Sequence, residues 1–393
     1  MESTPTPRAQ HRAASGPRRA SRRAILVGAA GAAFLGGCGR QPAADPTPVV
    51  FATPGIAVAA FEDPARWRGR HVTVAAWGGE VQDALRAAVW EPFSRATGAD
   101  VVDVVGDYAL LGTPQAGRAP YADLVLVDAV WAAGGAAAAT LQPLPDGLAA
   151  VVPPLPFGAS PLTVPAFAYA LVGAHVAGLA GTPPPLEGWA AWWDVSAHPG
   201  ARALGSDPLG TLEFALLADG VAFDQLYPLD LDRAVASLRR VRDSVGDRWW
   251  SAGFDPVGWL GSGRAALASA WHHRVVAGNW DGLGLTIVWR QGMLVADRWG
   301  VPAAAENADV AADLVRYALT PEVQASLASV LPLGPVVPEA FGLIDPFVAA
   351  TLPTDPSRVD QLFVPDAAWW AANRAEARRR IAEVAPLAAP VSG

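Results

Sequence analysis

The chain contains no lysine: it has 393 residues and 29 basic side chains, and every one of these is arginine. A Walker-type phosphate loop needs a lysine that reaches the terminal phosphates of a nucleotide. The sequence therefore excludes a P-loop ATPase. The net charge of −8 argues against a nucleic-acid partner, because such binding needs a basic face that displaces counterions.

Cysteine is almost absent, since Cys38 is the only one, and no internal disulfide can form. The segment before it has the layout of an export signal. Residues 1–23 are polar and arginine-rich, and residues 27–37 are apolar but too short to span a bilayer stably. The pair Arg22-Arg23 in "SRRAIL" resembles a twin-arginine export signal, and "LGGC" at residues 35–38 resembles a lipoprotein box.

These features predict three consecutive parts at the N-terminus. Residues 1–37 form a signal peptide, Cys38 becomes lipidated, and residues 38–70 form a proline-rich tether. We therefore expect an exported, lipid-anchored protein at the outer face of the cytoplasmic membrane or in the periplasm. Sec export remains the alternative to the twin-arginine route.

Catalytic motifs are also lacking, because the chain has no HExxH, no GxSxG and no metal-type cluster of cysteine and histidine. Adjacent His272 and His273 follow a predicted strand, and within a strand they would point to opposite faces, which disfavours joint chelation. We expect no enzyme, no cofactor and no metal site. A carboxylate pair brought together in a cleft leaves a hydrolase as a minor alternative.

What is present is an α/β pattern. Apolar strands are expected at residues 72–77, 99–105 and 122–128, and the first two flank a helix that Gly98 ends. The run "ADLVLVD" at residues 122–128 is typical of a parallel strand buried on both faces. Further strands are expected at residues 166–173, 264–271 and 284–289.

Helices are predicted over residues 209–219, 232–245 and 366–383, with a shorter one after residue 188. Residues 301–330 give two amphipathic helices separated at Thr320-Pro321, where proline can open a helix. The proline-rich stretch 153–165 suits a crossover between two lobes. At 393 residues the chain is too long for one ordinary core, which also favours two lobes.

Several of these segments, in order, resemble the extracytoplasmic solute-binding proteins of ABC importers, in the branch of the spermidine/putrescine-binding proteins. Any one segment is weakly specific, but the ordered set covers most of residues 71–375. The matching segments are residues 75–101, 122–128, 188–208, 219–241, 268–274, 297–324 and 366–374.

This resemblance implies the type II periplasmic-binding-protein fold, in which two α/β lobes are joined by crossing hinge strands and a ligand cleft lies between them. The boundaries that fit are residues 71–163 with 297–345 for lobe 1, and residues 164–296 with 346–393 for lobe 2. It also implies a small-molecule ligand, permease subunits as partners and a monomer.

The resemblance further implies six ligand-binding residues, because polyamine recognition needs carboxylates for ammonium groups and aromatic faces for the methylene chain. These are Trp77, Glu80, Asp128, Asp207, Trp271 and Asp297. Four of them have ordinary alternatives. Trp77 and Trp271 could be core residues, Asp207 could only cap the helix that Pro208 opens, and Asp297 could pair with Arg298.

The sequence also departs from the polyamine-binding pattern. Where those proteins carry tyrosines, this chain has Glu80, Val130 and Leu333, and where they carry a second acid it has Gly210. Asp128 stands where a small polar residue is common. We expect a solute-binding lipoprotein for a small polar or cationic, polyamine-like solute; a sensor, or a binder of a sugar, an amino acid or an anion, remains the alternative.

Overall fold

The computed structural model describes residues 63–106, 121–145, 148, 157, 160–176 and 186–386. The predicted signal peptide, Cys38 and the tether up to residue 62 lie outside the described residues. Within these ranges, no helix combines the length and apolar character needed to cross a bilayer.

The described part of the chain is organised around one mixed sheet with the strand order β2-β1-β3-β8-β4-β7-β5-β6, and β9 pairs with β8 as well. The strands are β1 (His71–Ala76), β2 (Asp100–Val105), β3 (Leu124–Val127), β4 (Thr163–Val176), β5 (Arg202–Gly205), β6 (Trp249–Trp250), β7 (Leu267–Trp271), β8 (Leu285–Gly300) and β9 (Leu362–Phe363).

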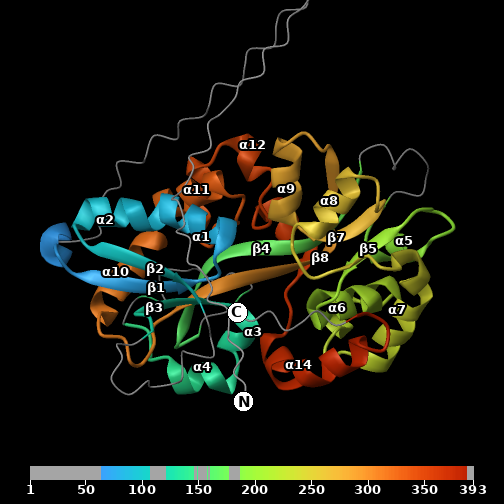
Figure 1. Cartoon of the computed structure of the whole chain (residues 1–393), viewed down its shortest axis with the longest axis horizontal. Coiled ribbons are helices and arrows are strands. Elements are labelled where there is room, and N and C mark those ends of the chain that lie inside the picture. Colours follow the sequence, from blue (N-terminus) through green and yellow to red (C-terminus); the bar gives the residue numbers. More distant parts are fainter. Residues whose placement is uncertain are drawn as a thin grey trace, which may run out of the picture. The chain divides into compact units, whose positions relative to one another are not determined.

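Two long antiparallel strands, β4 and β8, connect the two ends of this sheet (Figure 1). At one end β1 runs parallel to β2 and β3, and at the other β5 runs parallel to β6 and β7. The strand expected at residues 284–289 is therefore only the beginning of β8, which continues to Gly300. Because both long strands pass between the two ends, they are the natural hinge.

The helices cover both faces of the sheet, as Figure 1 shows. In the first part of the chain they are α1 (Gly79–Leu85), α2 (Glu91–Thr97), α3 (Ala129–Ala132), α4 (Gly135–Thr140), α5 (Trp189–Trp193), α6 (Pro208–Ala218) and α7 (Leu231–Val245). The later ones are α8 (Asp255–Gly261), α9 (His272–Trp280), α10 (Ala308–Ala318), α11 (Pro321–Val330), α12 (Pro346–Ala349), α13 (Pro356–Val359) and α14 (Ala367–Ile381).

Short helical turns complete the list: a 3₁₀ turn at Pro64–Trp67, a π-helical turn at Arg86–Trp90 that joins α1 to α2, and 3₁₀ turns at Phe223–Gln225 and Pro338–Leu343. The helices predicted at residues 209–219, 232–245 and 366–383 correspond to α6, α7 and α14. The predicted break at Thr320-Pro321 separates α10 from α11.

Helix starts and stops follow local chemistry. Asp-Pro pairs open four helical segments, and in each the aspartate side chain accepts a hydrogen bond from the backbone N–H two residues later, at Asp63, Asp207, Asp345 and Asp355. Gly98 ends α2 in the left-handed conformation, with φ of 72°. Of these boundaries, the Gly98 stop was predicted from the sequence, and the Asp207 cap was one of the two alternatives for that residue.

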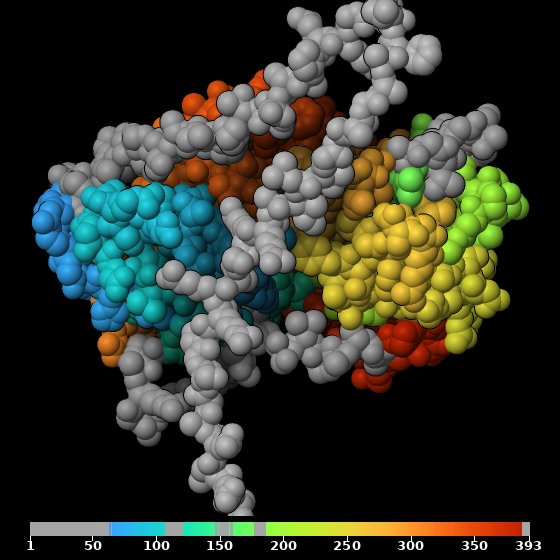
Figure 2. Space-filling view, turned by 45° about the horizontal axis from the view of Figure 1, so that its top comes forward, coloured from blue at the N-terminus to red at the C-terminus, as the bar shows by residue number. Residues whose placement is uncertain are grey.

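Two large groups of buried apolar side chains fill the molecule at the two ends of the sheet. The first core cluster includes Trp90, Phe93, Leu124, Phe167, Trp299 and Leu314. The second core cluster includes Trp189, Trp192, Phe214, Leu238, Val275 and Trp370. In Figure 2 the blue and cyan surface of α1 and α2 and the yellow surface around residue 250 lie at opposite ends of the visible face.

Candidate functional site

Strand ends bring together residues that are far apart in sequence. Trp77 follows β1 and Asp128 follows the parallel strand β3, so both lie at the carboxyl edge of the same half of the sheet. In the antiparallel pair β3·β8, Val127 lies opposite Arg298, which places Asp128 beside Asp297. Such strand ends are the usual location of ligand sites in α/β folds.

Asp297 is the centre of this group, and the residue is only 3% exposed. Its Oδ2 accepts a hydrogen bond from Trp77 Nε1 at 2.6 Å, and its Oδ1 accepts one from the Tyr169 hydroxyl at 2.8 Å. The alternative of a surface ion pair with Arg298 is wrong, because Asp297 is buried and Arg298 donates to Thr163 and to the Phe157 carbonyl.

Aromatic rings extend this group toward the second core cluster. The Tyr169 ring meets the Trp271 ring edge-on at 5.1 Å between centroids, and the His273 ring at 6.1 Å. Trp271 ends β7 and is only partly buried, as is Trp77. We call Trp77, Asp128, Tyr169, Trp271 and Asp297 the Asp297 cluster; it combines one buried carboxylate, a second acid and three aromatic side chains.

The Asp297 carboxylate holds its proton unusually tightly. Burial raises its pKa from 3.8 to about 7, hydrogen bonds from Tyr169 and Trp77 act in the opposite direction, and the nearby charge of Asp128 raises it further. A cation placed here would favour the ionised form. The cluster can therefore exchange a proton for an ammonium group.

Glu80 lies outside this cluster. It stands in the first turn of α1, and its carboxylate forms an ion pair with the Arg274 guanidinium from the first turn of α9. Before Glu80, Gly78 and Gly79 have φ of 79° and 60°, conformations that side chains other than glycine rarely adopt. Gly78 and Gly79 therefore allow the tight bend from β1 to α1 directly after Trp77.

Asp207 has two partners. Its Oδ1 caps α6 by accepting from Leu209 N at 2.9 Å, and its Oδ2 pairs with Arg374 at 3.0 Å. The helix-capping alternative is thus present in the structure, and Asp207 lies at the carboxyl end of β5, next to β7. This position allows a ligand contact, but the Asp207 carboxylate already forms an ion pair with the Arg374 guanidinium.

Of the six residues predicted from the sequence, the structure thus brings Trp77, Asp128 and Asp297 together and joins Trp271 to them through Tyr169. Sequence reasoning missed Tyr169. The one available signal was its place in the apolar strand "AFAYALVG", where a single hydroxyl stands among buried side chains and needs a partner.

Two histidines occupy the start of α9 instead of the end of a strand, which corrects the expectation for His272 and His273. His272 accepts from Ala170 N at 3.0 Å and lies 2.7 Å from the Pro332 carbonyl, so its Nε2 carries the proton. Burial lowers its pKa to about 4. Among the described residues, no group of three or more potential metal ligands is found.

A second buried carboxylate, Glu213, joins α6 to Tyr227 and to Trp370 of α14 by hydrogen bonds. It accepts hydrogen bonds from Gly210 N at 2.9 Å, the Tyr227 hydroxyl at 2.6 Å and Trp370 Nε1 at 2.7 Å. Burial raises its pKa to about 7. This network was not predicted from the sequence; it attaches α14 to α6 and so holds Arg374 near Asp207.

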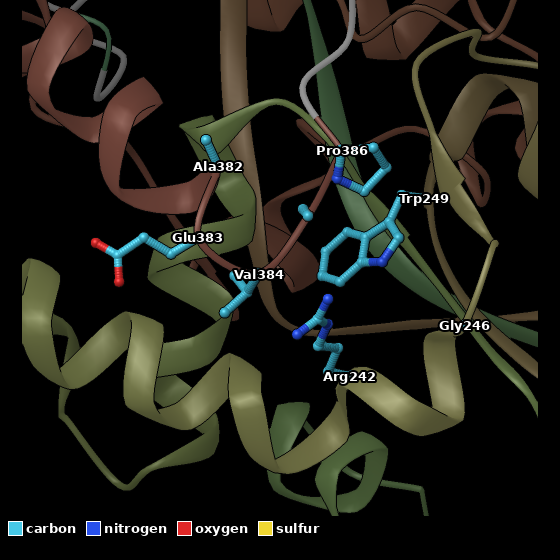
Figure 3. Close-up of a pocket in the computed structure, with 8 residues that line it drawn as sticks. Arg242, Gly246, Trp249, Ala382, Glu383, Val384 and Pro386 are labelled. Carbon is cyan, nitrogen blue, oxygen red and sulfur yellow. The ribbon is translucent and has the colours of Figure 1, made fainter.

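A pocket of about 300 Å³ opens elsewhere, between the end of α7 and the residues after α14. Figure 3 shows the Arg242 guanidinium and the Trp249 ring facing each other in it, while the Glu383 carboxylate points away. None of the six predicted ligand residues lines this pocket. It is therefore separate from the Asp297 cluster.

Comparison with known proteins identifies the family to which this chain belongs. The family model for bacterial extracellular solute-binding proteins matches residues 88–353, and the chain belongs to this family. It is similar to the gamma-aminobutyric acid-binding protein of Pseudomonas aeruginosa, at 28% identity over 84% of this chain and 95% of the relative.

Two solved structures share the fold. An ABC transporter substrate-binding protein from Bradyrhizobium japonicum has a TM-score of 0.73 at 29% identity, covering 80% of this chain and 99% of its own. The Atu4243-GABA receptor has a TM-score of 0.72 at 30% identity, covering 80% and 97%. The fold is the two-lobed α/β fold of the periplasmic binding proteins, and these relatives are binding proteins, not enzymes.

Proposed function

We propose that this protein is the substrate-binding component of an ABC importer and that it captures a small solute with one ammonium group at the Asp297 cluster. The observation that carries the proposal is the Asp297 carboxylate, held between Trp77 Nε1 and the Tyr169 hydroxyl beside partly buried tryptophans. A carboxylate with aromatic faces around it is the usual receptor for an ammonium group.

A single ammonium fits the charges better than a polyamine does. Of the four predicted acids, Glu80 is paired with Arg274 and Asp207 with Arg374. Among the described residues, Asp128 and Asp297 form no ion pair, and Asp128 Oδ1 caps α3 by accepting from Trp131 N at 2.8 Å. Because the two acids are neighbours, they serve one cation rather than two separated ones. The relatives named for gamma-aminobutyric acid support a small ω-amino acid as the ligand class, and the polyamine prediction becomes the competing candidate.

A ligand screen of the mature domain tests this proposal. Thermal shift followed by calorimetry would compare gamma-aminobutyric acid, putrescine, spermidine and glucose at pH 7.5. We expect gamma-aminobutyric acid to raise the melting temperature most, because a ligand that binds only the folded state stabilises it by mass action. A shift with putrescine alone would restore the polyamine reading, and a shift with glucose alone would refute an ammonium site.

We also propose the predicted anchoring and lobe boundaries. Export by a twin-arginine signal and lipidation of Cys38 would tether the folded body through the predicted segment 38–70. The end of that segment is not free chain, because Pro64–Trp67 forms a 3₁₀ turn and Trp67 packs in the first core cluster. The two core clusters support two lobes, and the strands β4 and β8, in which the predicted divisions at residues 163 and 297 lie, contribute side chains to both clusters. Cell fractionation of Cys38→Ser should move the protein from the membrane to the soluble fraction, whereas continued membrane retention would exclude this anchor.

Transport is the role we prefer over sensing, and the mature protein is expected to act as a monomer. The purified protein with gamma-aminobutyric acid should stimulate ATP hydrolysis by its permease complex in proteoliposomes. If the ligand-loaded protein does not stimulate ATP hydrolysis, a role as a sensor is favoured instead.

A further inference from the structure

Two similar strand-to-helix units face each other in this structure. In one, Trp77 follows β1 and Glu80 stands three residues later in the first turn of α1. In the other, Trp271 ends β7 and Arg274 stands three residues later in the first turn of α9. Both tryptophans belong to the Asp297 cluster, and the two charged residues pair with each other.

The two helices belong to different cores. Helix α1 buries Ala84 and Leu85 in the first core cluster, and α9 buries Val275 in the second. The ion pair therefore joins the two halves of the molecule directly. By contrast, Asp83 of α1 pairs with Arg86 three residues away, and Glu91 of α2 pairs with Arg95 four residues away, so these ion pairs do not join the two halves.

The two partners are fixed to different degrees. The Arg274 side chain is 15% exposed, and its guanidinium lies 3.9 Å from the centroid of the Phe254 ring. It is therefore held by a residue of its own half of the molecule. The Glu80 side chain is 45% exposed and stands on a short helix directly after the Gly78-Gly79 bend. If the halves separate, Glu80 becomes hydrated and Arg274 loses its carboxylate.

We propose that the Glu80–Arg274 pair is a closing contact between the two lobes, made when they meet around the Asp297 cluster and broken when they part. Both are then positioning residues: Glu80 acts on the ligand by holding the closed form, not by touching it. This inference rests on the proposed function only in taking the Asp297 cluster as the ligand site.

The expected size is modest, because partly exposed ion pairs contribute little and are screened by salt. Loss of the pair should shift the balance between open and closed forms by about two- to fivefold. A ligand that binds the closed form would then dissociate faster by about the same factor.

The primary test needs no ligand. Spin labels on Glu91→Cys in α2 and Asp243→Cys in α7, in the mature protein with Cys38→Ser, report the distance between the lobes by double electron–electron resonance. We expect Glu80→Gln and Arg274→Gln each to raise the population with long distances. The double variant should do no more than either single one, because both remove the same contact.

Asp83→Asn is the matched control, since it removes an exposed acid of α1 whose partner lies within the same core, and it should leave the distance distribution unchanged. Unchanged distances in both single variants, or additive effects in the double one, would overturn the inference. In 1 M salt the wild-type distribution should approach that of the variants.

A second measurement separates this inference from the ligand assignment. Stopped-flow dissociation of gamma-aminobutyric acid should be about two- to fivefold faster from Glu80→Gln than from the wild type, with a smaller change in the association rate. If gamma-aminobutyric acid does not bind the wild type, the proposed ligand is wrong while the distance measurement still decides the closing contact. Equal dissociation rates with normal binding would overturn the contact's role.

Discussion

The raised pKa of Asp297 predicts how ligand affinity depends on pH. The increase from 3.8 to about 7 means that ionising this buried carboxylate in the empty site costs about 4 kcal/mol more than in water, at about 1.4 kcal/mol per pH unit. An ammonium ligand needs the ionised form. Affinity should therefore rise about tenfold per pH unit from pH 5 to about 7 and level off above it.

Affinity rises with pH because the ligand displaces a proton from the empty site. Below pH 7 the empty site holds a proton that the ligand must displace, so acid competes with binding. Between pH 5 and pH 8 the dissociation constant for gamma-aminobutyric acid should fall by about a hundredfold. Calorimetry at pH 5, 6, 7 and 8 in buffers of different ionisation enthalpy measures both the affinity and the proton released.

Variants make this prediction sharp. Asp297→Asn should bind weakly and lose the pH dependence, because no carboxylate remains to titrate. Asp128→Asn removes a charge that raises the Asp297 pKa, so the midpoint should move to lower pH. Asp100→Asn, an exposed acid at the start of β2, should behave as wild type. A wild-type affinity that does not change with pH, or an unchanged pH dependence in Asp297→Asn, would refute the prediction that ionisation of Asp297 controls binding.

Three further predictions concern stability and the cluster. Asp297 and Glu213 both have pKa values raised to about 7, so the unliganded protein binds their protons more tightly than the unfolded chain does. The resulting stabilisation is full below about pH 4 and is lost as the pH rises through 7. The urea midpoint should therefore fall from pH 5 to pH 8, and a rise would contradict this prediction. Glu213→Leu leaves Gly210 N and the Tyr227 hydroxyl without this acceptor, while Trp370 Nε1 keeps the Tyr227 oxygen at 3.0 Å. It should lower the free energy of unfolding by roughly 2–4 kcal/mol in urea titrations, with Glu213→Gln as the milder control. Trp271→Ala should weaken binding of gamma-aminobutyric acid by about tenfold in calorimetry while Trp259→Ala, on α8, does not; equal effects would remove Trp271 from the ligand site.

Much of the fold was predictable because its signals are local. The buried run over β3, the Gly98 stop and the Asp-Pro helix starts each follow from a few adjacent residues. The extent of β8 was not, because "RQG" at residues 290–292 breaks the apolar pattern directly after the predicted end at residue 289, and Asp297 and Arg298 interrupt it again. They are tolerated there since the strand is paired on both sides and each charge finds partners from distant segments.

For the candidate site, the sequence by itself determined that Trp77, Asp128 and Trp271 stand at strand ends and that Asp207 stands at a helix start. Only the tertiary structure decided their partners. It paired Glu80 with Arg274 from 194 residues away and joined Asp297 to Tyr169 across β4 and β8. Strand ends are set by local pattern, whereas the choice of partner depends on register and lobe packing, which no short segment encodes.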